Sequence, residues 1–269
     1  MVSCDFHLHT VFGDGKHTPE EVAAQACADG IQILGFSEHS YLPFETFSMQ
    51  PEEQGDYIAR IDALKTSYRG RMTVLCGLEK DYYSTVDEGA FDYVVGSVHY
   101  VKCGDTYASM DLSPDATDEN VKTFFGGDPY AYAKAFFALE ADLFHHVKAD
   151  IIGHIDLLMK FHERTPLLDP QDKRYVTAWQ EAVEALIPYG KPFEINSGAI
   201  SRGWRTTPYP APDILRFIKE KGGHIVLSSD SHAKETLRFR FDASRELALA
   251  CGFTTQLIPT GKGLDEVAL

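Results

Sequence analysis

The chain has 269 residues, of which 44% are hydrophobic and 24% charged, and its net charge is −15 at pH 7. This composition is ordinary for a globular protein, and no apolar run approaches the ~18 residues of a membrane span. The acidic balance, without a cluster of Lys and Arg, argues against nucleic acid as a partner. A small anionic substrate is compatible with it, because bound cations can reverse the field locally.

The first residues of the chain and the placement of its cysteines bear on the cellular compartment in which we expect the protein. The first residues, MVSCDFHLHT, lack the basic start and apolar core of a secretory signal. The five cysteines are odd in number and widely scattered, without a Cys-x-x-Cys pair, which favours apolar packing over disulfides or a zinc ribbon. We expect a cytoplasmic protein with no membrane partner, and the sequence carries no signal for its oligomeric state.

Seven short apolar segments are typical of strands that are covered on both faces, as in a parallel sheet. In chain order they are VSCDFHLH (2–9), IQILGFSEH (31–39), MTVLCGLEKD (72–81), FDYVVGSVHY (91–100), DIIGHIDLL (150–158), PFEINSGAI (192–200) and HIVLSSDSH (224–232). Between the third and fourth strands there is room only for a turn or a very short helix.

Helical patterns follow most of these strands. In the first, HTPEEVAAQACADG, Thr18 is expected to cap the helix, Pro19 to lie in its first turn, Glu21 to complete a capping box and Gly30 to end it. Further helices are expected within 51–68, 128–147, 172–187, 211–222 and 234–252. The stretch 102–128 is a long insertion between the fourth and fifth strands.

Strands that alternate with helices over this length predict either a parallel barrel or an open doubly wound sheet. Six of the strands end in His, Glu or Asp, at the end where barrel enzymes build their sites, whereas an open sheet would gather ligands at one switch point. We therefore predict an α/β fold, a TIM-like barrel, with residues 1–269 forming a single domain. Neither a G-x-G-x-x-G motif nor a Walker loop is present.

The polar residues at the strand ends predict a metal centre. His7 and His9 are two residues apart, so in a strand they project from the same face. One ion takes about four to six ligands, so the nine candidates suggest two or three ions, and mixed imidazole and carboxylate ligands suit Zn, Mn or Fe. The nine candidates are His7, His9, Asp14, His39, Glu79, His99, His154, Asp230 and His232.

These motifs resemble the polymerase and histidinol phosphatase (PHP) family of metal-dependent phosphoesterases. The likeness spans residues 5 to 232 and includes the N-terminal His-x-His, the Glu after the third strand and the Val-His, Gly-His and Ser-Asp-x-His elements. It implies a distorted (β/α)7 barrel with three divalent ions, of which Glu79 bridges two. The implied ligand sets are His7, His9, Glu79 and Asp230 for one ion, Glu79, His99 and His154 for the second, and Asp14, His39 and His232 for the third.

Within this family, the length, the GSVHY element and the insertion at 102–128 look most like the histidinol-phosphate phosphatases. This likeness implies hydrolysis of L-histidinol phosphate to L-histidinol and phosphate, a step of histidine biosynthesis. Charge counting agrees with a phosphomonoester dianion, since three divalent ions, three carboxylates and a hydroxide leave about +2. Metal coordination lowers the pKa of water to about 7, so we expect direct attack by metal-bound hydroxide.

Other residues are expected to act on the substrate. Glu79, Asp230 and His232 are the predicted catalytic residues, the last two as candidates for the general acid. Arg202, in the loop after the sixth strand, is expected to bind a phosphate oxygen as a fork. Further candidates for substrate contacts are Lys160, Arg205 and His17, with Glu45, Phe44 and Asp81 as candidates for the leaving group.

Three alternative functions remain open. Another phosphatase of the same family, acting on nucleotides or other small phosphomonoesters, would share the same ligands. Amidohydrolase barrels, which cleave carbon–nitrogen bonds, also open with His-x-His, but many of them bridge their metals with a carboxylated lysine, where this chain has Glu79. A metal-binding module without activity is the third alternative, and the presence of every candidate ligand argues against it.

Overall fold

A computed structural model describes residues 2–269 and contains a seven-stranded parallel sheet. Beyond its first and last strands the two edges meet, because His9 N–H donates to the Ser231 carbonyl at 2.8 Å and Ser231 N–H donates to the His7 carbonyl at 3.1 Å. The sheet is therefore a nearly closed barrel, as predicted. Its strands in order are β1 (Cys4–Asp5), β2 (Ile33–His39), β3 (Thr73–Asp81), β4 (Tyr93–Ser97), β7 (Ile151–Ile152), β8 (Pro192–Asn196) and β9 (His224–Ser228).

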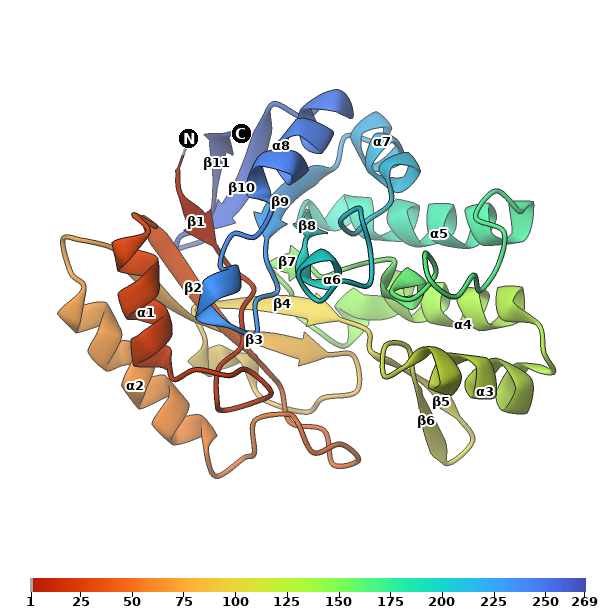
Figure 1. Ribbon diagram of the computed structural model, residues 1–269, viewed down its shortest axis with the longest axis horizontal. Helices are drawn as coiled ribbons and strands as arrows, with labels where there is room; N and C mark the ends of the chain where they lie inside the picture. The colour runs from red at the N-terminus through yellow and green to blue at the C-terminus, as the bar shows by residue number, and fades with distance from the viewer. Residues whose placement is uncertain (1) are drawn as a thin grey trace.

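Helices surround this barrel, with α1 and α2 on the left of the strands in Figure 1 and α4 and α5 on the right. The helices that follow strands are α1 (Pro19–Ala28), α2 (Gln54–Ser67), α4 (Pro129–Asp142), α5 (Lys173–Leu186), α6 (Gly198–Ser201), α7 (Pro212–Glu220) and α8 (Phe241–Ala250). A short 3-10 turn, η1 (Glu88–Ala90), fits between β3 and β4. Within residues 2–269, no helix has both the length and the apolar character needed to span a membrane.

The start of α1 follows from its sequence. Thr18 Oγ1 accepts the N–H of Glu21 at 3.3 Å, and Glu21 Oε2 accepts the N–H of Thr18 at 3.0 Å, which is the predicted capping box. Pro19 is the first helical residue, where a backbone N–H is not needed. Gly30, with φ +73°, follows the end of the helix. The capping box thereby fixes the point at which the chain leaves the loop that carries Asp14.

Two predictions about element boundaries are wrong. The first and fifth predicted strands pair over only two residues each. The last helix was predicted from residue 234 but begins at Phe241, because Arg238 and Arg240 have left-handed backbone angles, with φ 52° and 59°. The N–H of Arg238 donates to the buried carboxylate of Asp5 at 2.9 Å, so a contact distant in sequence holds this segment outside the helix.

The insertion contains structure that the sequence analysis did not assign. β5 (Tyr100–Cys103) and β6 (Thr106–Ser109) form an antiparallel hairpin, and α3 (Pro114–Phe125) follows it. Ser113 Oγ accepts the N–H of Ala116 at 3.1 Å and caps this helix. The hairpin and α3 stand at the carboxyl end of β4, where they form part of the wall of the cavity described below.

Three clusters of buried apolar side chains form the core. The first packs α4, α5 and α7 onto the sheet, the second packs α1 and α2, and the third fills the barrel. A C-terminal hairpin, β10 (Thr255–Pro259) and β11 (Leu264–Ala268), was not predicted and adds Ile258 to the third cluster. Among the described residues all five cysteines are free thiols, and Cys4, Cys76 and Cys251 are buried.

Tyr93 fills the centre of the third cluster. Its hydroxyl donates to the carbonyls of Phe6 at 2.7 Å and Phe36 at 3.0 Å, and its side chain is fully buried. The ring fits because Gly35 and Gly77 have no side chains, since a Cβ at either position would lie 2.4 Å from an atom of Tyr93. These contacts join the first four strands of the barrel and thereby fix the strand ends that carry the polar residues.

Candidate metal centre

The nine predicted ligands meet at the carboxyl ends of the strands. His39 and Glu79 are near the ends of β2 and β3, Asp14 lies in the loop before α1, and the other six follow strands β1, β4, β7 and β9. Each of the nine belongs to at least one group whose ligand atoms lie within 4.8 Å of one another. The nine side chains therefore gather in one place, although they come from segments spread over most of the chain.

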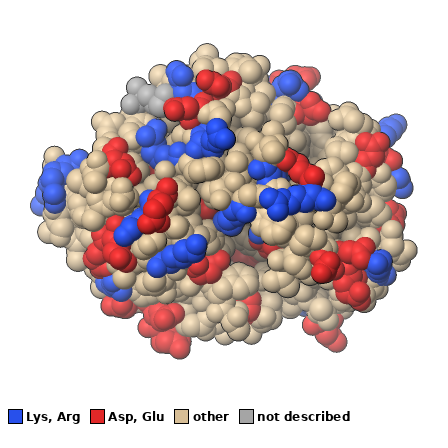
Figure 2. Space-filling model, viewed as in Figure 1, with Lys and Arg blue, Asp and Glu red and all other residues tan. Residues whose placement is uncertain are grey.

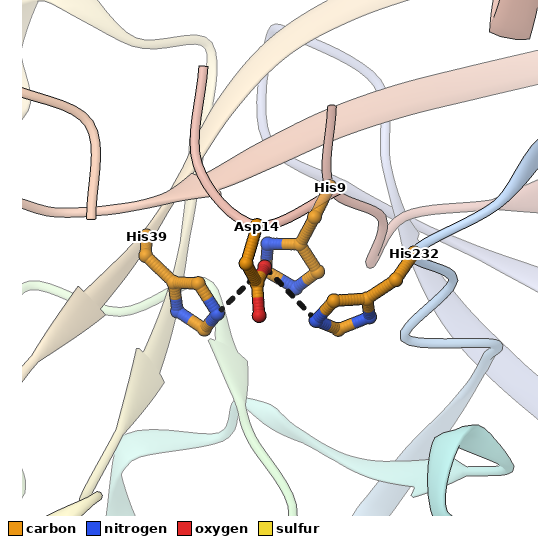
Figure 3. Close-up of side chains that lie close together, drawn as sticks. All are labelled: His9, Asp14, His39 and His232. Carbon is orange, nitrogen blue, oxygen red and sulfur yellow. Dashed lines mark ion pairs between the residues drawn. The ribbon is translucent and has the colours of Figure 1, made fainter. Parts of the chain in front are cut away.

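The ligand atoms form four overlapping groups. These are His9, Asp14, His39 and His232; His7, His9 and Asp230; His7, Glu79 and His154; and His39, Glu79 and His99. Figure 3 shows the first group, in which Asp14 lies between two imidazoles, with its Oδ1 3.1 Å from His232 Nε2 and 3.7 Å from His39 Nε2. Because the groups share members, they make up a single centre with room for more than one ion.

Glu79 lies at the middle of this centre and turns its two oxygens toward different imidazoles. Oε1 lies 3.1 Å from His154 Nε2 and 3.3 Å from His99 Nε2. Oε2 lies 2.7 Å from His39 Nδ1 and 3.3 Å from His7 Nε2. Because each oxygen of Glu79 approaches a different pair of imidazoles, this carboxylate has the geometry needed to bridge two cations.

The carboxylates and imidazoles of the centre shift one another's pKa values. Burial works to lower the pKa of His39, but Glu79 and Asp14 outweigh it and raise that pKa to about 9, so this ring must lose a proton before it can bind an ion. Burial and the neighbouring imidazoles of His39 and His232 lower the pKa of His9 to about 3, so this ring is neutral near pH 7. Burial works to raise the pKa of Glu79, but the imidazoles of His7 and His39 outweigh it and hold that pKa well below its usual value. A neutral imidazole beside an ionised carboxylate is a typical pair of metal ligands.

Two acidic residues that were not predicted to belong to the centre contact the Nδ1 atoms of two of its histidines. Glu194, in the middle of β8, lies 2.5 Å through Oε1 from His7 Nδ1, and both side chains are fully buried. Asp81 Oδ2 lies 3.2 Å from His99 Nδ1 and also accepts the backbone N–H of His99 at 3.0 Å. Carboxylates in this position fix the tautomer and orientation of ligand histidines. A charged residue inside an otherwise apolar strand is the sequence signal for Glu194.

Arg202, predicted to bind phosphate, lies against Asp230 and His232. Its Nη2 donates to Asp230 Oδ2 at 2.9 Å, and its Nη1 lies 2.9 Å from His232 Nδ1. The close approach requires Gly198, since a Cβ there would lie 2.5 Å from Asp230 Oδ2 and 2.8 Å from Arg202 Nη2. Arg202 therefore orients two candidate ligands, and it also lines the cavity in front of them.

A cavity of about 710 Å³ opens in front of the candidate ligands. Lys160 lies in its wall and donates to Asp111 Oδ2 at 2.9 Å. Glu45 and Phe44 line the cavity farther out, whereas Asp81 does not line it. Figure 2 shows a hollow near the centre of this face with Lys and Arg side chains close to it, although the protein as a whole is acidic. The volume suits a small metabolite.

Several other candidates lie away from the cavity. His17 Nδ1 accepts the N–H of Lys234 at 3.2 Å, and His17 does not line the cavity, so its predicted contact with substrate has no support here. Arg205 packs over the ring of Tyr209 at 4.4 Å and lines a different cavity. Asn196, the last residue of β8, was not among these candidates, and its Nδ2 donates to Asp230 Oδ2 at 3.3 Å.

The donor set fits metal ions. Nε2 of His7 and Nε2 of His9 are buried and form no hydrogen bond with any group in residues 2–269. Burial of a polar atom without a partner is costly, and a cation held by these nitrogens would remove that cost. The cluster contains imidazole nitrogens and carboxylate oxygens without a thiolate, a set that suits transition-metal ions.

The model of the PHP domain matches residues 5–198 of this chain. The chain belongs to the PHP domain family. This PHP domain is 34% identical over 263 residues to a Deinococcus radiodurans protein named "Probable histidinol-phosphatase", with 91% of this chain and 92% of the relative covered. It is 23% identical to a Bacillus subtilis protein named "Histidinol-phosphatase", with 91% and 99% covered. The family membership and the clustered donors identify a metal-binding PHP domain.

A solved structure shares the fold of this PHP domain. It is the histidinol phosphate phosphatase of Lactococcus lactis, determined in complex with Zn, L-histidinol and phosphate. The two chains superpose with a TM-score of 0.77 at 22% sequence identity, with 98% of this chain and 99% of the other covered. At this identity, the likeness shows that both chains form the same nearly closed barrel.

Proposed function

We propose that this PHP domain hydrolyses L-histidinol phosphate to L-histidinol and phosphate, using three divalent metal ions drawn from Zn, Mn or Fe. The observation that carries the proposal is the set of overlapping ligand groups around Glu79, at the floor of a cavity with Arg202 and Lys160 in its wall. The names of the relatives, and the ligands held by the Lactococcus lactis enzyme, support this substrate.

The residues assigned to each ion are those that the resemblance to the PHP family implies. We assign His7, His9, Glu79 and Asp230 to one ion, Glu79, His99 and His154 to a second, and Asp14, His39 and His232 to a third. The placement of Glu79 Oε1 near His99 and His154 supports the shared ligand. When bound, the ions would supply Lewis-acid stabilisation of the phosphate oxygens and an acidified water.

Asp230 and His232 were both expected to take part in proton transfer. Burial favours a protonated Asp230, but Arg202 and His7 outweigh it and hold its pKa well below the usual value, so Asp230 is ionised, as an ion ligand must be, and carries no proton to give to the leaving group. If His232 Nε2, which lies 3.1 Å from Asp14 Oδ1, holds an ion, that nitrogen has no proton to give. The ring proton is then on Nδ1, which lies 3.1 Å from the Asp230 carbonyl oxygen. We therefore assign His232 to ion binding and not to proton transfer.

The guanidinium of Arg202 and the ammonium of Lys160 are assigned to the phosphate group. Both line the cavity, and each is held by a carboxylate, Asp230 for Arg202 and Asp111 for Lys160. These carboxylates fix the direction of the two cations before substrate arrives. A planar guanidinium can donate to two phosphate oxygens at once, whereas the ammonium acts as a point charge.

Glu45 is assigned to the amine of the leaving group. Its Oε2 accepts the hydroxyl of Tyr100 at 2.9 Å, and its Oε1 is buried without a hydrogen bond to any described residue. Phe44 stacks on Tyr107 beside it, with ring centroids 3.8 Å apart, and both rings line the cavity. A carboxylate next to aromatic rings suits a leaving group that has both a cationic amine and an imidazole ring.

Phosphate release tests the proposal. Protein reconstituted with Mn or Zn is assayed with L-histidinol phosphate, 4-nitrophenyl phosphate and a nucleoside monophosphate. The proposal requires a kcat/KM for L-histidinol phosphate far above the other two. Similar values for all three would leave a phosphatase of other small phosphomonoesters, and no release from any of them would favour carbon–nitrogen hydrolysis or a binding module.

One buried cluster joins segments from both ends of the chain, from Cys4 in β1 to Ile258 in β10. We therefore propose that the whole chain, residues 1–269, acts as one domain. The free cysteines are compatible with a reducing cytoplasm, where histidine biosynthesis would take place. Limited proteolysis of the metal-loaded protein tests the first point, since a single domain resists cleavage as one unit.

A further inference from the structure

A second cavity, of about 350 Å³, lies on the outside of the barrel. It is formed by α5, α7 and the segment after β7, and it shares no lining residue with the cavity of the metal centre. Figure 1 shows α5 and α7 on the same side of the strands. Its volume is at the lower end of the range for small-molecule sites, and nothing in the proposed phosphatase reaction uses it.

Two oppositely charged side chains are buried at this cavity. Arg205 is 8% exposed, and its Nε and Nη1 form no hydrogen bond with any described residue. Asp156 is fully buried, with Oδ2 accepting the N–H of Ala211 at 3.0 Å and Oδ1 without a hydrogen-bond partner among residues 2–269. The closest approach of the two groups is 3.6 Å, from Arg205 Nη1 to Asp156 Oδ2. Each charge therefore has hydrogen-bonding capacity left over.

The rest of the cavity wall is largely apolar, apart from His162 and the exposed side chains of Glu163, Gln171 and Asp213. Its apolar lining includes three residues of the buried core, Met159, Trp179 and Ile214. The half-buried side chain of Val176 also lines it. A buried polar atom without a partner costs free energy, so a site with an unused donor, an unused acceptor and apolar walls is matched by a ligand with the same three features.

We infer that this cavity binds a free α-amino acid with an apolar side chain. Its carboxylate would accept from Arg205 Nε and Nη1, its ammonium group would donate to Asp156 Oδ1, and its side chain would lie against Trp179. A singly charged molecule leaves one of the two buried groups unpaired, and that loss makes the site selective for a zwitterion. This inference does not depend on the substrate proposed for the metal centre.

The two tryptophans of the chain provide a direct readout. Trp204 packs against Phe161 and does not line this cavity, so Trp204→Phe leaves Trp179, in the cavity wall, as the remaining tryptophan. Metal-loaded protein carrying this change is titrated with L-leucine, with isoamylamine, which lacks the carboxylate, and with 4-methylpentanoate, which lacks the amine. We expect a saturable change of Trp179 emission with L-leucine and a response at least ~10-fold weaker with either analogue.

Two further variants, made in the Trp204→Phe protein, locate the site. Val176→Phe fills the cavity and leaves both charges in place, so it should abolish the response. Thr177→Phe is the matched control, because Thr177 is the exposed neighbour on α5 and does not line the cavity. Arg205→Met should weaken L-leucine binding at least ~10-fold. Phosphatase activity should be unchanged in the Val176 and Thr177 variants, which shows that they fold.

Three results would overturn the inference. The first is the absence of any response to L-leucine up to about 10 mM, a concentration at which even a weak site with Kd near 1 mM is mostly filled. The second is an equal response to all three compounds, which indicates apolar partitioning alone. The third is a response that persists in Val176→Phe, which places the ligand elsewhere.

Discussion

Glu79 offers one oxygen to His99 and His154 and the other to His7 and His39. Glu79→Gln keeps the volume of the side chain but replaces one oxygen by a donor that cannot bind a cation. If Glu79 bridges two ions, this variant should lose more than about one ion per chain and more than ~100-fold in kcat, because even residues behind a ligand contribute ~10–100-fold. Elemental analysis of the purified protein measures the first quantity, and full metal content would contradict the bridge.

Glu45 permits a separate test of specificity. Glu45→Gln keeps the contact with Tyr100 but removes the charge proposed to pair with the amine of the leaving group. KM for L-histidinol phosphate should rise ~10-fold or more, the value of a hydrogen bond to a charged group, with the metal content unchanged. The kcat/KM for 4-nitrophenyl phosphate, which has no amine, serves as the control and should stay constant. Equal losses for both substrates would mean that Glu45 only supports the fold.

Most of the candidate ligands could be predicted from the sequence because they follow apolar strands. A polar side chain at the end of a buried strand is unfavourable unless it has a partner. Glu194 could not be found in this way, since it lies within β8 and its partner His7 is 187 residues distant in sequence. Glu45 and Lys160 lie in loops, where charged residues are common, so only the cavity wall distinguishes them. His17 shows a different limit, because a histidine that lies near the ligands in sequence does not line the cavity.

Within the sheet, Tyr93 of β4 occupies space that Gly35 of β2 and Gly77 of β3 leave open. Gly77→Ala would bring a methyl group 2.4 Å from the Tyr93 ring and 2.7 Å from the Phe36 carbonyl oxygen. We expect a loss of about 2–3 kcal/mol in the free energy of unfolding, typical of an overpacked core. Urea denaturation measures it.

Gly55→Ala is the matched control for that substitution. Gly55 lies in α2, and a Cβ there would meet nothing within 4 Å. Because alanine favours helix formation, this variant should be more stable than the parent by about 0.5–1 kcal/mol. A Gly77→Ala protein as stable as Gly55→Ala would show that the barrel accommodates a larger residue beside Tyr93.

The helices and strands differ in how far local sequence determined them. The capping box and the glycine after it located α1 closely, because both signals act within a few residues. The start of α8 was missed, because Asp5, more than two hundred residues away in sequence, holds Arg238 in a loop. The hairpin of β5 and β6 was missed because its strands are only four residues long, which is too short for a periodic pattern.

At the scale of the whole molecule, the barrel closes between β1 and β9 with few hydrogen bonds, near His7, His9 and Asp230. Ions held by these residues would join the two edges, so removing them should destabilise the fold. A ligand at about 100 times its Kd adds about 2.7 kcal/mol, so a chelator should lower Tm by roughly 5–10 °C. Calorimetry with and without EDTA measures this shift, and an unchanged Tm would exclude the ions as a link between the edges.

The positions of the ligands along the chain also determine when the metal centre can form during synthesis. The candidate ligands begin at His7 and end at His232, so the last of them leaves the ribosome only after most of the chain has been synthesised. At about 5–20 residues per second, the first histidines wait more than ten seconds for their partners. A nascent or truncated chain that stops before His232 therefore lacks the full set of donors, and uptake of the complete set of ions marks a chain synthesised at least as far as that residue.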